Sequence, residues 1–188
     1  FTKLSINPES IESIESYAFY GCSGFTDQLT LPSKISSIEQ YTFTNCSNFT
    51  GILTIPKSVI RIEKGAFSGC CKFTGLYQLP TELNSIGEDA FSHCSGIEGY
   101  LTIPDSVVSI SANAFLGCSG FNGFLALSQN LEVIEERIFS GCTHFNGILT
   151  IPDKVKYIKS EAFLNCVGFT GIKISSKLSG INSSAFQG

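Results

Sequence analysis

Residues 97–120 read IEGYLTIPDSVVSISANAFLGCSG, and close copies of this 24-residue unit fill the rest of the chain. A fixed period of about 20 to 50 residues is typical of a solenoid, in which each unit buries its apolar face only against its neighbours. The sequence therefore predicts one continuous domain over residues 1–188, with about seven repeats of 24 residues and a partial last repeat. The phenylalanine and cysteine of the Ala-Phe-x-x-Cys phrase recur at Phe19/Cys22, Phe43/Cys46, Phe67/Cys70, Phe91/Cys94, Phe115/Cys118, Phe139/Cys142 and Phe163/Cys166. The six prolines keep the same spacing, at Pro8, Pro32, Pro56, Pro80, Pro104 and Pro152.

Within one unit, two periodicities follow each other. Residues 101–103 alternate apolar, polar and apolar, which predicts a strand with one buried face, and the proline that follows ends it. The apolar side chains of Ile110, Ala114 and Cys118 then come at intervals of four, which favours one or two turns of helix. Residues 107–110 also suit a brief second strand, so a plain parallel β-helix stays open.

The leading prediction for the fold is an α/β solenoid. Each repeat would consist of a strand, a turn, a short helical segment and a second turn. Strands on one side and wider turns on the other would curve the stack. We therefore expect a right-handed stack with a concave parallel β-sheet and short helical or 3-10 turns on its convex side.

The repeat resembles a known family. The phrase L-x-I-P-x-x-V-x-x-I-x-x-x-A-F-x-x-C is similar to the Treponema-type leucine-rich repeat of the BspA-like surface proteins, and residues 151–166 match it at each of its key positions. The resemblance covers the whole chain. The family's usual unit is one residue shorter, and the extra residue follows the Phe-x-Gly turn at Ile52, Leu76, Tyr100, Phe124 and Ile148. The resemblance implies a leucine-rich repeat fold, a location at the cell surface or outside the cell, and adhesion to host cells or extracellular matrix.

Composition excludes several other classes. Charged residues make up 15% of the chain and the net charge is −4, with no cluster of lysine or arginine, so nucleic acid is not an expected partner. No apolar run approaches the length that spans a bilayer, so no direct membrane insertion is expected in this segment. The chain starts without methionine and without a polar capping repeat, and we expect it to be a fragment of a longer protein.

Binding residues are expected at exposed positions whose side chains vary from one repeat to the next. Strand alternation points one polar row outward, comprising Thr54, Gln78, Thr102 and Thr150. It points the extra residues Ile52, Leu76, Tyr100, Phe124 and Ile148 the same way. An exposed apolar stripe usually marks an interaction site, so the concave face is the predicted binding face. The alternative is that these side chains pack only on one another.

The cysteines are predicted to be unbridged. Seven of the eight occupy one inward position in successive repeats, and parallel Cβ vectors suit disulfides poorly. Cys71 lies outside that row and is predicted to be an exposed, reactive thiol. No Cys-x-x-Cys motif occurs, and His93 and His144 lie in different repeats, so no metal site and no cofactor are expected. Three sequons, at Asn45, Asn48 and Asn182, are possible glycosylation sites.

Catalysis is not expected. Enzymes need unlike groups converging on a pocket, whereas repeats present like groups in rows. The sequence therefore favours a non-catalytic protein-interaction module, which the resemblance identifies with the ligand-binding ectodomain of a surface adhesin or antigen. Its partner would be a host-surface or matrix protein, or a second copy. An intracellular, cytoplasmic repeat scaffold and a structural, self-assembling repeat protein are the alternatives.

Overall fold

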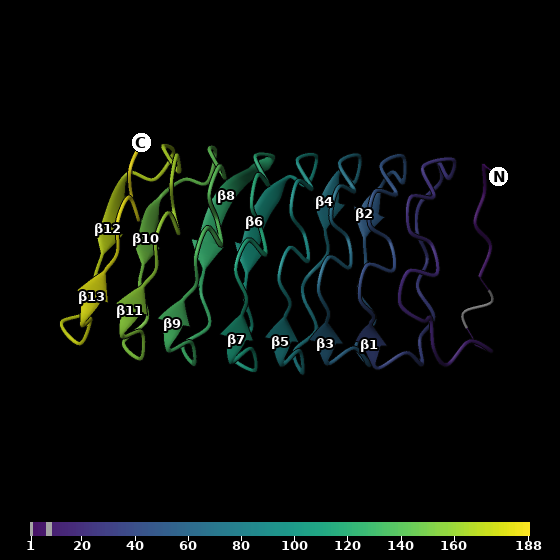
Figure 1. Cartoon of the computed structure of the whole chain (residues 1–188), viewed down its shortest axis with the longest axis horizontal. Coiled ribbons are helices and arrows are strands. Elements are labelled where there is room, and N and C mark those ends of the chain that lie inside the picture. The colour runs from purple at the N-terminus through teal and green to yellow at the C-terminus, as the bar shows by residue number, and fades with distance from the viewer. Residues whose placement is uncertain (1, 7–8) are drawn as a thin grey trace.

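The computed structural model describes residues 2–6 and 9–188, so Pro8, the first of the six prolines, lies outside the described residues. The chain forms one elongated row of coils, with its termini at opposite ends (Figure 1). Two families of parallel strands run along the row. We call them the even-strand and odd-strand ladders, after their numbers in Figure 1.

The even-strand ladder contains the strands that the alternating pattern predicts. Its members are β2 (Ile52–Leu53), β4 (Gly75–Leu76), β6 (Gly99–Thr102), β8 (Phe121–Ala126), β10 (Ile148–Thr150) and β12 (Gly171–Lys173). They pair in parallel as β2 with β4, β6 with β8, and β10 with β12. Between these pairs the ladder lacks regular pairing in the described residues, so it consists of three short sheets.

The odd-strand ladder consists of the brief second strands that the sequence pattern allowed as an alternative to a helical segment. Its members are β1 (Ser37–Ile38), β3 (Arg61–Ile62), β5 (Ser85–Ile86), β7 (Ser109–Ile110), β9 (Val133–Ile134), β11 (Tyr157–Ile158) and β13 (Gly180–Ile181). The register follows the repeat length, since Ile62 pairs with Ile86 and Ile86 with Ile110. The isoleucine of each strand from β1 to β11 is buried, which explains the alternating side-chain pattern at these positions.

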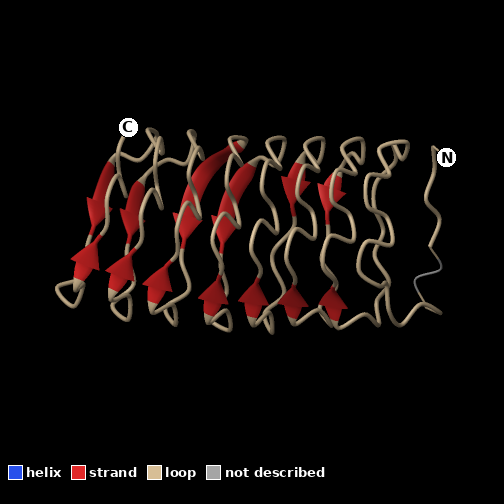
Figure 2. Ribbon diagram, in the orientation of Figure 1, coloured by secondary structure: helices blue, strands red, loops and turns tan. Residues whose placement is uncertain are grey.

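The predicted helical segments are wrong. Among residues 2–6 and 9–188 the structure contains strands, turns and loops but no helix (Figure 2). Residues 112–117 form tight turns in which Asn113 and Gly117 adopt left-handed conformations, with φ of 59° and 69°. A right-handed helix cannot continue through such residues. The four-residue interval therefore reflects a left-handed residue at every fourth position.

Hydrogen bonds between repeats replace the helix. The N–H groups of Asn113, Phe115 and Gly117 donate to the carbonyl oxygens of Glu136, Ile138 and Ser140, at 3.0, 2.9 and 2.8 Å. The same three bonds recur in the neighbouring repeats, for example from Gly65, Phe67 and Gly69 to the following coil. We call this row the turn ladder. The fold is thus a β-solenoid with parallel sheets, and the expected helical convex side is absent from its described part.

Two phenylalanine ladders fill the core. In the first, which runs from Phe19 to Phe163 and ends on Phe186, successive rings stack with centroids 5.2 to 5.6 Å apart. The second joins Phe25, Phe49 and Phe73, and then Phe121, Phe145 and Phe169, with buried Ile97 between the two runs. Rings of the two ladders meet edge to face, as aromatic quadrupoles favour. Most of these rings are fully buried, so their regular recurrence serves the core.

Candidate binding face

The structure places most of the predicted binding residues on the outer face of the even-strand ladder. Ile52, Tyr100 and Phe124 are each 50% exposed, and Ile148 is 66% exposed. The polar row Thr54, Gln78, Thr102 and Thr150 is exposed beside them. These positions alternate with buried leucines, because successive side chains of a strand point to opposite faces.

Tyr100 and Phe124 are in direct contact. Their rings stack with centroids 4.9 Å apart and planes within 5° of each other. The two side chains therefore pack on one another, as the alternative interpretation expected, and yet each keeps half of its surface exposed. Stacking holds the two rings as one rigid aromatic platform.

The prediction that Leu76 points outward is wrong. Leu76 is half-buried against the core, while Tyr77, which the 24-residue period aligns with buried Leu53 and Leu101, is 61% exposed. The register moves accordingly, since Leu53 pairs with Leu76. A tyrosine is larger than leucine and its hydroxyl needs a polar partner, so the chain shifts by one residue and buries Leu76 instead. Tyr77 thus joins the exposed face, and the tyrosine at a leucine position was the sequence signal for it.

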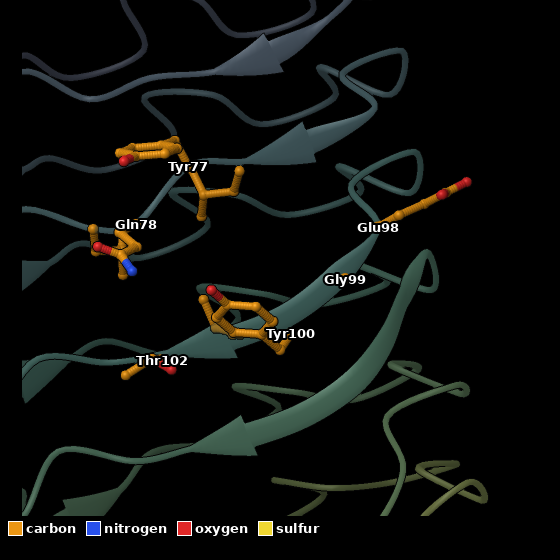
Figure 3. Close-up of a pocket in the computed structure, with 9 residues that line it drawn as sticks. Tyr77, Gln78, Glu98, Gly99, Tyr100 and Thr102 are labelled. Carbon is orange, nitrogen blue, oxygen red and sulfur yellow. The ribbon is translucent and has the colours of Figure 1, made fainter.

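The shift opens a hollow between β4 and β6. Only one isolated bridge, between Gly75 and Glu98, pairs the backbones of these two strands in the described residues. The hollow has a volume of about 160 Å³ and is lined by Leu76, Tyr77, Gln78, Leu79, Glu98, Gly99, Tyr100, Leu101 and Thr102. Figure 3 shows Tyr77, Gln78, Tyr100 and Thr102 grouped together, and the side chain of Glu98 directed away from them.

Acidic residues that are adjacent in the sequence, such as Glu88 and Asp89, lie along the turn ladder. Glu88 forms an ion pair with Lys64 of the preceding repeat at 2.7 Å, and burial, then the charge of Glu88, raises the pKa of Asp89. Glu136 contacts Arg137, which also reaches Glu161 of the next repeat at 2.7 Å. Glu88 and Glu161 thus join neighbouring coils through exposed ion pairs. Within the described ranges, no group of three or more His, Cys, Asp or Glu side chains could hold a metal ion.

The thiols form a third ladder inside the core. All eight cysteines are free, and Cys46, Cys70, Cys94, Cys118 and Cys142 are buried. From Cys46 to Cys166, each thiol of the row donates to the carbonyl oxygen of the phenylalanine one repeat back, at 2.9 to 3.2 Å. Burial raises the pKa of Cys46 and of Cys166 to about 12. Cys71 is the one exposed cysteine of the eight, and the other seven are buried or half-buried.

Thiol titration of the folded protein should therefore show one fast equivalent, from Cys71. The thiolate is the reactive form, and desolvation suppresses it in the buried row at pH 8. We expect Cys71→Ser to remove the fast phase, while Cys94→Ser leaves it intact. A fast phase of two or more thiols, or one that survives Cys71→Ser, would contradict the exposure of these groups.

The sequons differ in their surroundings. Asn45 and Asn182 are exposed. The side chain of Asn48 is engaged, because its Nδ2 donates to the Ser23 carbonyl at 2.7 Å and its Oδ1 accepts from Lys72 at 2.6 Å. A glycan at Asn48 would break both bonds, so Asn45 and Asn182 are the two sequons with open side chains. Their modification stays a prediction.

Comparison with known proteins extends the sequence resemblance. The model of the BspA type leucine rich repeat region matches residues 1–122 and 121–188, in six copies. No curated protein matches the chain significantly. No helix in the described residues is long and apolar enough to cross a membrane.

Three solved structures show the same architecture. A leucine-rich repeat protein from Bacteroides ovatus is 30% identical over 90% of this chain, with a TM-score of 0.80, and the chain spans 43% of that protein's length. The leucine rich repeat protein of T. pallidum is 25% identical over 83% of this chain and 70% of its own, with a TM-score of 0.71. A leucine rich cell surface protein from Faecalibacterium prausnitzii is 20% identical over 90% of this chain and 65% of its own, and at a TM-score of 0.51 it supports the fold alone.

Proposed function

The chain belongs to the BspA-type leucine-rich repeat family, and from this premise we propose that it is a non-catalytic protein-interaction module that binds through the outer face of its even-strand ladder. The observation that carries the proposal is the row of exposed apolar side chains on that face, at whose centre Tyr100 and Phe124 stack. We call it the aromatic row, and it comprises Ile52, Tyr77, Tyr100, Phe124 and Ile148, each at least half exposed. Exposed apolar patches of this kind usually mark interaction sites, and tyrosine and phenylalanine are enriched in interfaces.

The arrangement of the polar groups supports a binding role over a catalytic one. Catalysis requires a nucleophile, a base and an orienting group within hydrogen-bond distance of one another. Here Glu88 and Glu161 pair with lysine or arginine of neighbouring coils, and the thiol of Cys118, like others of its row, is held by a backbone carbonyl oxygen. The outer face of the even-strand ladder presents threonine hydroxyls, the Gln78 amide and aromatic rings. They suit recognition of a protein surface.

The finer form of the proposal concerns location and partner. The BspA-like proteins that the repeat resembles are surface proteins, and the family match carries this part of the proposal. We propose that this chain is the ligand-binding part of a surface adhesin or antigen, and that its partner is a host-surface or matrix protein. Labelling of intact cells with an impermeant reagent tests the location, and protection of the chain until the cells are lysed would favour the cytoplasmic scaffold.

The double variant Tyr100→Ser with Phe124→Ser tests the binding face. Binding to immobilised, purified matrix proteins should weaken by about 30-fold or more, because two anchors of the kind that dominate interfaces are lost. The matched control is Val108→Ser with Tyr157→Ser, which removes two exposed side chains away from the binding face, one just before β7 and one in β11. Surface plasmon resonance measures both, and light scattering across concentration reports self-association.

Three outcomes separate the possibilities. Loss of binding in the first variant alone supports the proposal. Equal losses in the two variants overturn it. If only self-association falls, the partner is a second copy, and the proposal of a host partner is overturned.

A further inference from the structure

The hollow between β4 and β6 presents an aromatic ring to solvent. One face of the Tyr100 ring is covered by Phe124, at a centroid distance of 4.9 Å. Within the described residues Tyr100 stacks on no second ring, and it lines the hollow together with Tyr77 of the preceding repeat (Figure 3). Both tyrosines are at least half exposed, so a ligand can reach the ring from solvent. Three leucines complete the apolar part of the lining, Leu76, Leu79 and Leu101.

The hollow offers no charge to a ligand. Glu98 is the one carboxylic acid among its lining residues, and its side chain is directed away from Tyr100 and Gln78 (Figure 3). No lysine, arginine or histidine lines the hollow. A charged ligand would lose part of its hydration there without meeting an opposite charge. The lining therefore favours a neutral ligand.

The polar groups of the lining both donate and accept hydrogen bonds. Gln78 supplies an amide with two N–H donors and an acceptor oxygen, and Thr102 supplies a hydroxyl that can do either. Neither side chain makes a hydrogen bond within the described part of the chain. Across the hollow, no backbone hydrogen bond joins residues 76–79 to residues 99–102. A ligand with hydroxyl groups can use donors and acceptors of both kinds at once.

We propose that the hollow binds a neutral hexopyranose, as one sugar unit of a glycan on the protein partner. A pyranose whose hydroxyls are all equatorial has two faces made of C–H groups. One such face would stack on the open side of Tyr100, because the face of an aromatic ring is negatively polarised. The equatorial hydroxyls would exchange hydrogen bonds with the Gln78 amide and the Thr102 hydroxyl. The inference rests on the proposed function, because the partner protein would carry the glycan.

The competing occupant is an apolar side chain of a peptide, such as proline. It would contact the Tyr100 ring and the leucines, and it would leave the Gln78 amide and the Thr102 hydroxyl in water. Sites for small ligands combine apolar walls with a few polar groups that fix orientation, and this hollow has both. The two occupants therefore differ in how far their binding depends on the polar groups.

Saturation-transfer NMR with methyl β-D-glucopyranoside tests the inference directly. Sorbitol is the control probe, since it has similar hydroxyls and no rigid ring. We expect the glycoside to bind weakly, and at least about 5-fold more tightly than sorbitol, because only the glycoside has a flat C–H face. Thr102→Val should weaken binding of the glycoside about 3-fold or more, and Gln78→Leu should do the same. Thr150→Val is the matched control, since Thr150 is exposed in the same polar row and does not line the hollow.

Three results would overturn the sugar site. Equal binding of the glycoside and sorbitol is the first, and equal effects of Thr102→Val and Thr150→Val are the second. The third is binding of N-acetyl-proline amide that exceeds binding of the glycoside and is insensitive to Gln78→Leu, which would assign the hollow to an apolar side chain.

The glycan is tested on the immobilised matrix proteins themselves. Enzymatic removal of their glycans should weaken binding of the wild-type chain about 3-fold or more, as the loss of one sugar contact implies. If binding is unchanged and still depends on Tyr100 and Phe124, the inference is overturned and the interaction module stands. If the glycoside binds as expected and the matrix proteins ignore the aromatic row, the proposed function fails instead.

Discussion

Replacing Phe115 by alanine should lower the free energy of unfolding by about 3–5 kcal/mol. The ring is fully buried and stacks between Phe91 and Phe139, with centroids 5.2 and 5.4 Å away. It also meets Phe121 edge to face at 6.4 Å. Truncation removes the ring's transfer free energy and leaves a cavity, and neighbouring coils can relax little because the turn ladder ties them together.

The matched control is Phe124→Ala, the same substitution on the outer face. Phe124 is half exposed and contacts one ring, so the loss should be about 1 kcal/mol. Denaturant unfolding followed by circular dichroism measures both. In the Phe115→Ala variant, the repeats on the two sides of residue 115 are expected to unfold separately, because each repeat is stabilised only by its neighbours. The unfolding transition should therefore broaden. Equal losses at the two sites would mean that the phenylalanine ladder does not carry the core.

The repeat period predicted the core well. Phe115 and Ile110 recur at intervals of 24 residues, and both are buried because equal positions of successive coils lie above one another. The same logic placed Tyr100 and Phe124 on the outside, since they precede a buried leucine by one residue in a strand. Periodic patterns determine such features, because burial in a stack repeats with the sequence.

The prediction of a helical segment was wrong because two different conformations share the same four-residue period. An interval of four residues fits a helical face, and it fits a chain with a left-handed residue at every fourth position equally well. Asn113 and Gly117 are residue types that tolerate this conformation, and they were a usable signal. Arg137 and Glu161 adopt it as well, with φ of 53° and 59°, although neither type favours it. There the hydrogen bonds to the next coil decide the conformation.

The hollow was not predictable from the period. Its origin is one tyrosine at a leucine position, and whether Tyr77 or Leu76 enters the core depends on the packing of both alternatives. A shift of one residue exchanges the two faces of a strand, so a small difference in packing energy changes which side chains are exposed. Sites made by local departures from a repeat need the three-dimensional structure.

Replacing Cys118 by aspartate should have the largest effect on stability, and the effect should depend on pH. The thiol is fully buried, donates to the Phe91 carbonyl oxygen at 2.9 Å, and has its pKa raised well above the usual value by desolvation. The same surroundings should raise the pKa of a carboxyl group by about 3–5 units. At about 1.4 kcal/mol per unit, and with an unfolded pKa of about 3.9, the variant should lose about 4–6 kcal/mol by pH 8 relative to its protonated form.

The sign of the pH dependence follows from proton binding. With a folded-state pKa above the unfolded value of about 3.9, the folded variant holds more protons, so its stability falls as pH rises from that value through the folded pKa. Near pH 4 the protonated acid can donate to the Phe91 carbonyl as the thiol does, and part of the loss should disappear. Cys118→Asn is the matched control, since it has similar size and no titratable group in this range. Urea unfolding of wild type and both variants from pH 4 to 8 measures the differences. If the free energy of unfolding changes with pH in the same way for the two variants, water reaches this position. That result would contradict the burial of the cysteine row.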